Sequence, residues 1–348
     1  MAAGNPYVMT VRGPIDPDRL GIAMTHEHVF CDLGCWAQSP NTLLEKELTS
    51  SPLAMEILGE VRRDALVFPD NLTLHDADDA RDELADLIKM GGTAIVDCTV
   101  AGLEPRLPNL VALSEELDLH VVVGCGYYVH DSHPPRLEHA TVEGLTVELL
   151  QTISHGFEES AVRPGIIGEI GTSQPVHPRE WRVLEAACNA QVASGLPLFV
   201  HVHPFADGAT APEVVRFMLA HGVSPQRCNV CHMDGRLEAP YLREVLEMGV
   251  YVSFDTFGLE AYYDSIDRHS SFDADRERML LALLAEGYER QLLLSQDVCM
   301  KMQLRRYGGH GYSHILRHTV PSLRRRGVDQ RTLDTLLRDN PRRLLAVG

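Results

Sequence analysis

The sequence predicts an α/β fold, a (β/α)8 barrel, from a regular alternation of apolar runs and amphipathic stretches. Eight short apolar runs recur, and several end in polar residues: 21–28, 93–100, 120–128, 165–171, 196–203, 228–234, 250–258 and 291–297. Longer segments with helical periodicity lie between them: 79–90, 178–194, 210–221, 239–248, 273–286 and 312–326. This spacing is typical of right-handed parallel βαβ units, and eight such units favour a closed barrel. An open doubly wound sheet is the alternative, but no Gly-x-Gly-x-x-Gly motif follows any of the runs.

The chain of 348 residues is long enough for two domains, but we expect one barrel domain over residues 1–348. A barrel of this type fills about 250 residues or more without a second domain. Residues 1–20 are predicted to form a short hairpin before the first strand. Residues 36–78 are predicted to form an insertion or cap after that strand, with its helical part at 43–67. Whether this insertion closes over a site as a lid stays open.

The charge balance excludes several classes of partner. Asp and Glu number 49 against 31 Lys and Arg, which gives a net charge of −18. An excess of acid argues against general binding to nucleic acids or anionic membranes. No apolar run reaches the roughly 20 residues of a membrane span, and the N-terminal segment lacks an apolar signal core. We therefore expect a soluble, cytoplasmic protein that binds neither nucleic acids nor membranes.

The eight cysteines are expected to be reduced thiols that pack as small apolar groups. Cys228, Cys231 and His232 match the attachment pattern of a c-type haem. They lie in a predicted strand and do not open a helix, so we reject the haem interpretation.

Polar side chains gather where the predicted strands end, which is where barrel active sites lie. These residues are His26, His28, Glu169, His201, His203, His232, Asp234, Asp255 and Asp297. Alternation with period two places His26 and His28 on one face of their strand, and the same holds for His201 and His203. A single histidine at a strand end is most often a hydrogen-bonded core residue. Several imidazoles and carboxylates that converge on one barrel mouth require hydrogen bonds or a metal.

We therefore predict a metal site at this mouth. Its expected ligands are His26, His28, Glu169, His201, His232 and Asp297. Imidazole and carboxylate ligands suit Zn²⁺, with Mn²⁺, Fe²⁺ and Co²⁺ as alternatives. Six ligands are too many for one four-coordinate zinc ion, so two divalent ions about 3.5–4 Å apart fit better. His203 is interpreted as a residue that orients a neighbour or faces the substrate.

The ordered set of motifs resembles the phosphotriesterase family of the amidohydrolase superfamily. It is most similar to the phosphotriesterase-related branch, which also includes resiniferatoxin-binding-like proteins. The segments that carry the resemblance are GIAMTHEH (21–28), GIIGEIG (165–171), LFVHVHP (198–204), CHMD (231–234), YGGHGYSHIL (307–316) and DNPRRLLAV (339–347). The similarity covers almost the whole chain. Relatives of this kind are often homodimers, so the resemblance implies a homodimer.

The resemblance also implies a role for each ligand. His26, His28 and Asp297 would hold the more buried metal, and His201 and His232 the more exposed one. In many family members a carboxylated lysine bridges the two ions. Here the fourth predicted strand carries Glu169, and none of the three lysines of the chain lies at the end of that strand. The bridge is therefore expected to be this glutamate, whose shorter side chain requires the strand to sit closer or the metals to shift.

The implied mechanism is hydrolysis. The metals would lower the pKa of a shared water, and Asp297 would accept its proton and pass it to the leaving group. Three hypotheses on function stay open: hydrolysis of a carboxyl substrate (lactone, ester or N-acyl amide), phosphoester or phosphotriester hydrolysis, and non-catalytic binding of a small molecule. Tyr128, His203 and Arg305 are the expected substrate contacts. The basic loop at 301–312 is a candidate seat for an anionic group, although the net charge opposes anion steering.

Overall fold

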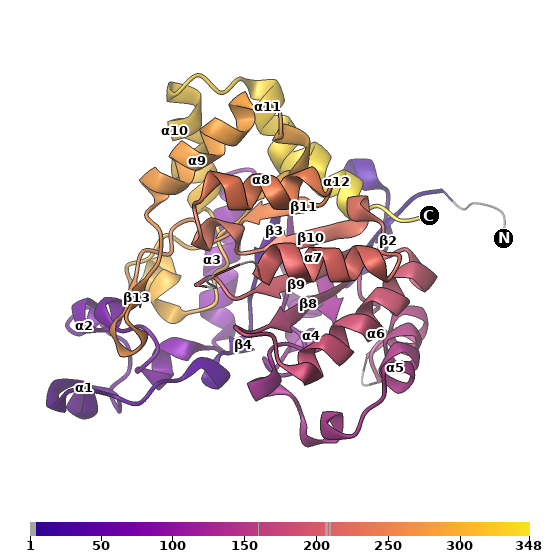
Figure 1. Ribbon diagram of the computed structural model, residues 1–348. Coiled ribbons are helices and arrows are strands. Elements are labelled where there is room, and N and C mark those ends of the chain that lie inside the picture. The colour runs from indigo at the N-terminus through magenta and orange to yellow at the C-terminus, as the bar shows by residue number, and fades with distance from the viewer. Residues whose placement is uncertain (1–4, 159, 206–207, 209) are drawn as a thin grey trace.

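The computed structural model describes residues 5–158, 160–205, 208 and 210–348, and its centre is one sheet of eight parallel strands (Figure 1). The strands are β3 (Ala23–Glu27), β6 (Ala94–Asp97), β7 (His120–Cys125), β8 (Ile166–Thr172), β9 (Leu198–Val202), β10 (Cys228–Cys231), β11 (Tyr251–Phe254) and β14 (Leu292–Leu294). Each strand pairs with the next along the chain, and the sheet nearly closes as a barrel. Seven of these strands lie within the predicted apolar runs, and β8 extends one residue beyond its run, so the predicted fold class is confirmed.

Contacts around Glu27 join the first and last strands of the barrel. Its carboxylate accepts hydrogen bonds from the hydroxyl of Ser295 at 2.7 Å and from the backbone N–H of Val298 at 3.0 Å. The backbone N–H of Asp297 donates to the carbonyl of His26 at 3.1 Å. Burial raises the pKa of Glu27 to about 7. The seam between β3 and β14 thus uses a side chain in place of a regular strand ladder.

Helices surround the sheet (Figure 1). Their bounds are α3 (Ala77–Lys89), α4 (Leu107–Leu117), α5 (Val142–His155), α6 (Pro178–Ser194), α7 (Thr210–Ala220), α8 (Ala239–Glu247), α9 (Asp273–Ala285), α10 (Val320–Arg325), α11 (Gln330–Asp334) and α12 (Asn340–Leu345). The helix predicted at 312–326 is interrupted, because residues Ile315–Thr319 form a π-helical turn before α10. Helix α5 was not predicted, since its glycine and β-branched residues have low helix propensity. Its N-terminus is capped by Thr141, whose hydroxyl accepts from the N–H of Gly144.

The insertion at 36–78 forms two short helices, α1 (Leu43–Leu48) and α2 (Leu58–Arg63), so the single helical stretch predicted at 43–67 is wrong. Pro52 lies between them, and a proline both removes a backbone donor and disfavours helix at the residue before it. The two helices lie at one side of the barrel next to β13 (Figure 1).

The insertion is tied to the loop that follows β11. This loop contains an antiparallel pair, β12 (Tyr262–Tyr263) and β13 (Arg268–His269). The carboxylate of Asp64 accepts from the backbone N–H of Ser265 at 2.6 Å and from its hydroxyl at 2.9 Å. The base of the insertion is closed by a second pair, β4 (Cys31–Asp32) and β5 (Thr73–Leu74). Two loops that are far apart in the sequence therefore form one wall.

The opposite end of the barrel is plugged by apolar side chains. On the interior faces of β9 and β11, Phe199 and Tyr251 belong to a buried cluster that also contains Val8 and Leu344. Val8 comes from a hairpin of β1 (Val8–Thr10) and β2 (Gly13–Ile15), and residues 1–4 of the predicted hairpin segment lie outside the described residues. Period-two alternation then places His201 on the same face as Phe199 but nearer the open mouth. Within the described barrel, the polar strand ends therefore lie at the end that the apolar cluster does not fill.

All eight cysteines are free thiols. No helix in the described part of the chain is long and apolar enough to cross a bilayer.

Candidate metal centre and active site

The structure brings the six predicted ligands together at the carboxyl ends of the strands. They are His26 and His28 on β3, Glu169 on β8, His201 on β9, His232 after β10 and Asp297 after β14. Glu169 is central: its Oε1 lies 3.3 Å from Nε2 of His28, and its Oε2 lies 3.5 Å from Nδ1 of His201 and 3.4 Å from Nε2 of His232. The residues that sequence spacing placed on five separate strands therefore form one buried cluster.

These separations are too long for hydrogen bonds but suit shared coordination. An N–H···O hydrogen bond spans about 2.7–3.2 Å. Two ligands of one tetrahedral zinc ion, with bonds of about 2.0–2.1 Å, lie about 3.3–3.4 Å apart. Among the described residues, both ring nitrogens of His26 and Oε2 of Glu169 lack a hydrogen-bond partner. Buried polar atoms are rarely left unpartnered, so this donor set fits divalent cations.

The two oxygens of Glu169 face different imidazoles. Oε1 is next to His28, whereas Oε2 lies within 3.5 Å of ring nitrogens of His26, His201 and His232. A carboxylate that presents each oxygen to a different ligand group is suited to join two ions.

Glycines allow β8 to lie very close to its neighbours. A Cβ added at Gly124 of β7 would overlap the carbonyl oxygen of Gly168, the residue before Glu169. The register between β8 and β9 also shifts between Ile167 and Ile170, and such bulges redirect a side chain. Both features agree with the expectation that a short glutamate needs its strand close to the cluster.

Side chains outside the cluster orient its histidines. Asp255, at the end of β11, accepts from the backbone N–H of His232 at 2.9 Å and lies 3.1 Å from Nδ1 of the same residue. Its second oxygen lies 3.3 Å from Nδ1 of His26, and Nδ1 of His28 lies 2.9 Å from the hydroxyl of Thr99. Such outer partners fix the ring orientation of a ligating histidine. The strand-end position of Asp255 was the signal in the sequence, but no pattern singled out Thr99.

Two cluster residues have a left-handed backbone directly after their strands. His232 has a φ of 59° and Asp297 a φ of 47°. Residues other than glycine rarely adopt this region, and where they do they are often functional. The conformation of Asp297 is held by Gln303, whose side-chain amide donates to its carbonyl at 2.8 Å. The turned backbone directs both side chains to the mouth.

The cluster is electrostatically suited to cations. Burial alone would raise the pKa of Glu169, but the charge of His26 and contacts with His201 and His232 hold it well below its usual value. Burial alone would lower the pKa of His28, but the neighbouring carboxylates of Asp297 and Glu169 raise it to about 9. The carboxylates are therefore ionised at neutral pH, and their field favours positive charge.

A cavity of about 110 Å³ adjoins the cluster. Trp36 and Leu66 of the insertion line it, together with Tyr263 from the loop after β11 and Met300 from the loop after β14. The insertion thus forms part of the wall of the cavity, and most of that wall is apolar.

Two of the three predicted substrate contacts line this cavity. The hydroxyl of Tyr128 lies 3.2 Å from Nδ1 of His201 and accepts from Nε1 of Trp36 at 3.2 Å. Burial, with the charges of His201 and His232, lowers the pKa of His203 to about 4, so its ring is neutral at physiological pH. Nδ1 of His203 accepts from the backbone N–H of Phe205 at 3.1 Å.

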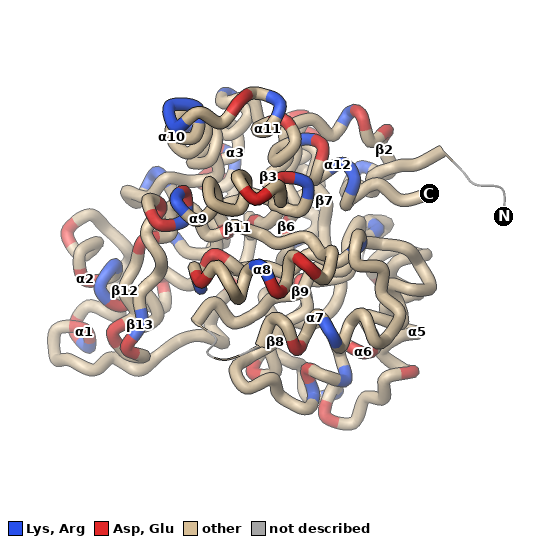
Figure 2. Tube along the Cα trace, turned by 45° about the horizontal axis from the view of Figure 1, so that its top comes forward, with Lys and Arg blue, Asp and Glu red and all other residues tan. Residues whose placement is uncertain are grey.

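The structure does not bring Arg305, the third predicted contact, to this cavity. Its guanidinium pairs with Asp86 of α3 at 2.8 Å. The neighbouring cations are paired as well, Lys301 with Asp70 and Arg306 with Asp79. Basic and acidic residues are interspersed in this way over the outer elements (Figure 2). The basic loop is therefore neutralised by acidic side chains and is not a seat for an anionic substrate group.

The cavity wall does contain one arginine among the described residues, Arg276 of α9, which was not predicted from the sequence. It is fully buried and lies 3.1 Å from Asp234 and 3.0 Å from Asp273. Nη2 donates to the hydroxyl of Thr256 at 2.8 Å. An arginine within a helix gives no sequence signal that it points toward a cavity.

We expect Arg276→Met to lower the free energy of unfolding by about 3–5 kcal/mol, because it leaves the buried carboxylate of Asp234 without its cationic partner. Urea denaturation measures this change. The matched control is Arg278→Met on the same helix, whose partner Asp275 lies 2.7 Å away at the surface. An exposed pair contributes no more than about 1 kcal/mol. Equal effects of the two substitutions would show that the buried pairing is unimportant.

A barrel with imidazoles and carboxylates of separate strands gathered at its mouth defines a class of metal-dependent hydrolases. The chain belongs to the phosphotriesterase family, whose family model matches residues 6–345. The resemblance predicted from the sequence motifs is thus confirmed, and the chain is a hydrolase of this family.

Three relatives illustrate the similarity. An N-acetyltaurine hydrolase of Salmo salar is 36% identical over 351 residues, which cover 99% of each chain. The crystal structure of a resiniferatoxin-binding protein from Rhodobacter sphaeroides has a TM-score of 0.95 and 34% identity, and the match covers 97% of this chain and 94% of that one. A phosphotriesterase homology protein from Escherichia coli, complexed with phosphate in its active site, has a TM-score of 0.78 and 27% identity, with 94% and 99% covered.

Proposed function

We propose that this chain is a two-metal hydrolase that cleaves the amide bond of small N-acyl substrates of the N-acetyltaurine type. The observation that carries the two-metal part is the position of Glu169, whose oxygens face different histidines of one buried cluster. The similarity to N-acetyltaurine hydrolases over 99% of the chain supports the choice of an amide.

In this proposal the ligands would divide into two groups around the bridge. His26, His28 and Asp297 would hold one ion, His201 and His232 the other, and Glu169 both. Zn²⁺ is the proposed metal, and Mn²⁺, Fe²⁺ and Co²⁺ suit the same ligands. When bound, such ions supply Lewis acidity toward the substrate oxygen and lower the pKa of water.

The chain's own residues move the protons. Asp297 is ionised, because the charge of His232 and contacts with His28 and His26 outweigh the effect of burial and lower its pKa. It accepts a proton from the attacking water, whose oxygen bonds to the carbonyl carbon, and delivers that proton to the leaving nitrogen as the C–N bond breaks. Tyr128 is placed beside His201 to donate to the substrate oxygen. The products are a carboxylic acid and an amine.

The cavity favours a short acyl group. Its volume is about 110 Å³, and Leu66, Cys299 and Met300 are among its apolar lining residues. An acetyl group suits such a space better than a long acyl chain does.

The test is a comparison of kcat/KM for the metal-loaded enzyme on N-acetyltaurine, a simple lactone, a carboxyl ester and a phosphotriester. We expect N-acetyltaurine to be the preferred substrate. Preference for the lactone or the ester would show that the enzyme acts on a carboxyl substrate other than an amide. Preference for the phosphotriester would favour phosphoester hydrolysis, a candidate to which the phosphate-bound Escherichia coli neighbour points. No turnover of any substrate by fully loaded enzyme would favour a binding protein.

A further inference from the structure

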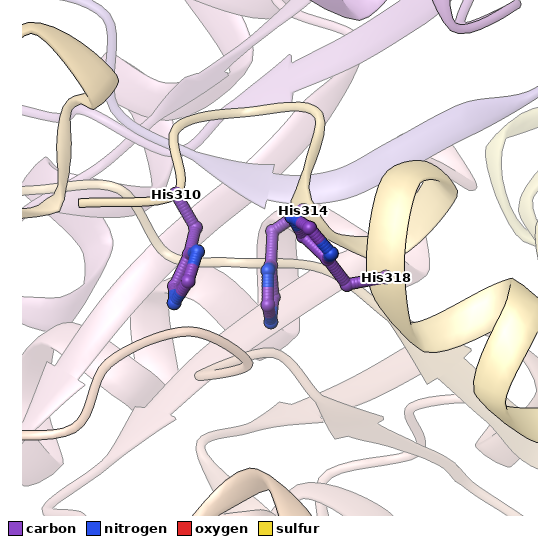
Figure 3. A group of neighbouring side chains, drawn as sticks. All are labelled: His310, His314 and His318. Carbon is purple, nitrogen blue, oxygen red and sulfur yellow. The ribbon is translucent and has the colours of Figure 1, made fainter. Parts of the chain in front are cut away.

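A second cluster of metal-ligating side chains lies outside the hydrolytic centre. It consists of three histidines that follow β14 at intervals of four residues, His310, His314 and His318 (Figure 3). One ring nitrogen from each histidine lies within 4.8 Å of a ring nitrogen from each of the other two. The π-helical turn Ile315–Thr319 begins directly after His314 and carries His318. The ring centroids of His310 and His314 are 4.3 Å apart, and those of His314 and His318 are 5.3 Å apart. π-helical turns are rare and often occur at functional sites.

The central histidine is already arranged as a ligand. His314 is 4% exposed, and its Nε2 lies 2.5 Å from a carboxylate oxygen of Asp273 on α9. Its buried Nδ1 has no hydrogen-bond partner among the described residues. A carboxylate that binds one ring nitrogen fixes the proton there and leaves the lone pair on the other nitrogen available. The unpartnered atom is therefore the one that is free to bind a cation.

The outer two histidines give access and further ligands. His310 and His318 are exposed, so an ion can enter from solvent. Partial burial, together with the neighbouring imidazoles of His314 and His318, lowers the pKa of His310 to about 4, and partial burial also lowers the pKa of His318. Both rings are unprotonated at neutral pH, which is the state that ligates metals. His310 also borders a cavity of about 120 Å³ that is lined by Arg62 and Glu260.

We propose that His310, His314 and His318 form a second metal site, which binds one divalent transition-metal ion of the Cu²⁺, Ni²⁺ or Zn²⁺ class. Three neutral imidazoles suit these ions, and Cu²⁺ binds such ligands most strongly among them. The site is separate from the Glu169 cluster. The contact between His314 and Asp273 links the site to α9.

The experiment is a titration of the enzyme, with its hydrolytic centre already loaded, with Cu²⁺. Bound copper is measured by elemental analysis, and its nitrogen ligands by electron paramagnetic resonance. We expect the wild-type protein to take up one additional equivalent with imidazole nitrogen couplings. His310→Gln and His318→Gln each remove a ligand. Mutation of a residue that only orients a ligand lowers metal affinity roughly 10–100-fold, so copper affinity should fall at least that much in each variant. Both side chains are exposed, so the variants should keep their fold and their resident metal.

The matched control is His155→Gln, which removes an exposed histidine on α5 and should leave copper binding unchanged. Three results would overturn the proposal. The first is no additional copper in the wild-type protein. The second is equal copper binding in wild type, His310→Gln and His318→Gln. The third is copper that enters only as the resident metal leaves.

Discussion

Asp297→Asn is expected to retain both metal ions and to lose turnover by about 10²- to 10⁴-fold, the range that a positioned acid or base contributes. The side-chain oxygens of Asp297 lie 3.4 Å from Nε2 of His28 and 3.7 Å from Nδ1 of His232. Asparagine keeps an oxygen that can face the cluster, but its amide cannot take up and release a proton at neutral pH. The loss should therefore appear in kcat, while the metal content stays close to that of the wild-type protein.

Elemental analysis and single-turnover kinetics on the same samples separate these two effects. Asp118→Asn is the control, because Asp118 is an exposed carboxylate paired with Arg12 far along the chain from the cluster. A fully loaded Asp297→Asn protein with wild-type kcat would remove the proton-transfer role. A variant that loses its metals along with its activity would make Asp297 a ligand only.

Glu169→Ala is expected to hold fewer than two ions per chain and to lose hydrolysis almost completely. Alanine removes both oxygens. One of them faces His28, and the other faces His26, His201 and His232. The remaining histidines would lose the negative charge that compensates a divalent ion. Removal of an outer hydrogen-bond partner of a metal ligand lowers metal affinity roughly 10–100-fold. Removal of this shared ligand should therefore lower the affinity of both sites by a larger factor. Metal content after dialysis, with circular dichroism to verify the fold, measures the effect.

A second buried carboxylate provides the control for Glu169→Ala. Glu180 on α6 is 0% exposed, and it accepts from the backbone N–H groups of Ser173 at 2.9 Å and His177 at 2.8 Å. Glu180→Gln should lower stability and leave the metal content unchanged. If Glu169→Ala still retained two full equivalents, the carboxylate would not be the bridge.

The barrel and its six candidate ligands were predictable from the sequence because both follow from short-range regularities. Parallel strands appear as apolar runs, and their polar last residues meet at one end of the barrel. His26 and His28 share a face by period-two alternation, and the three lysines of the chain left Glu169 as the carboxylate on the fourth strand.

What the sequence did not reveal depends on long-range pairing. Arg305 was expected near the substrate from the composition of its loop, but Asp86 on α3, more than 200 positions earlier, pairs with it. Arg276 reaches the cavity wall from the first turn of α9 and contacts Asp234 and Thr256. The sequence of a loop does not indicate which distant acidic residue will pair with a given arginine in the fold.

The most direct test of the account is anomalous X-ray scattering from crystals of the metal-loaded protein, measured at the absorption edge of its resident metal. The proposal that two ions share Glu169 predicts two peaks about 3.5–4 Å apart. One should lie beside Glu169 and His28, and the other beside Glu169, His201 and His232. A single peak, or two peaks that do not both contact a Glu169 oxygen, would contradict it.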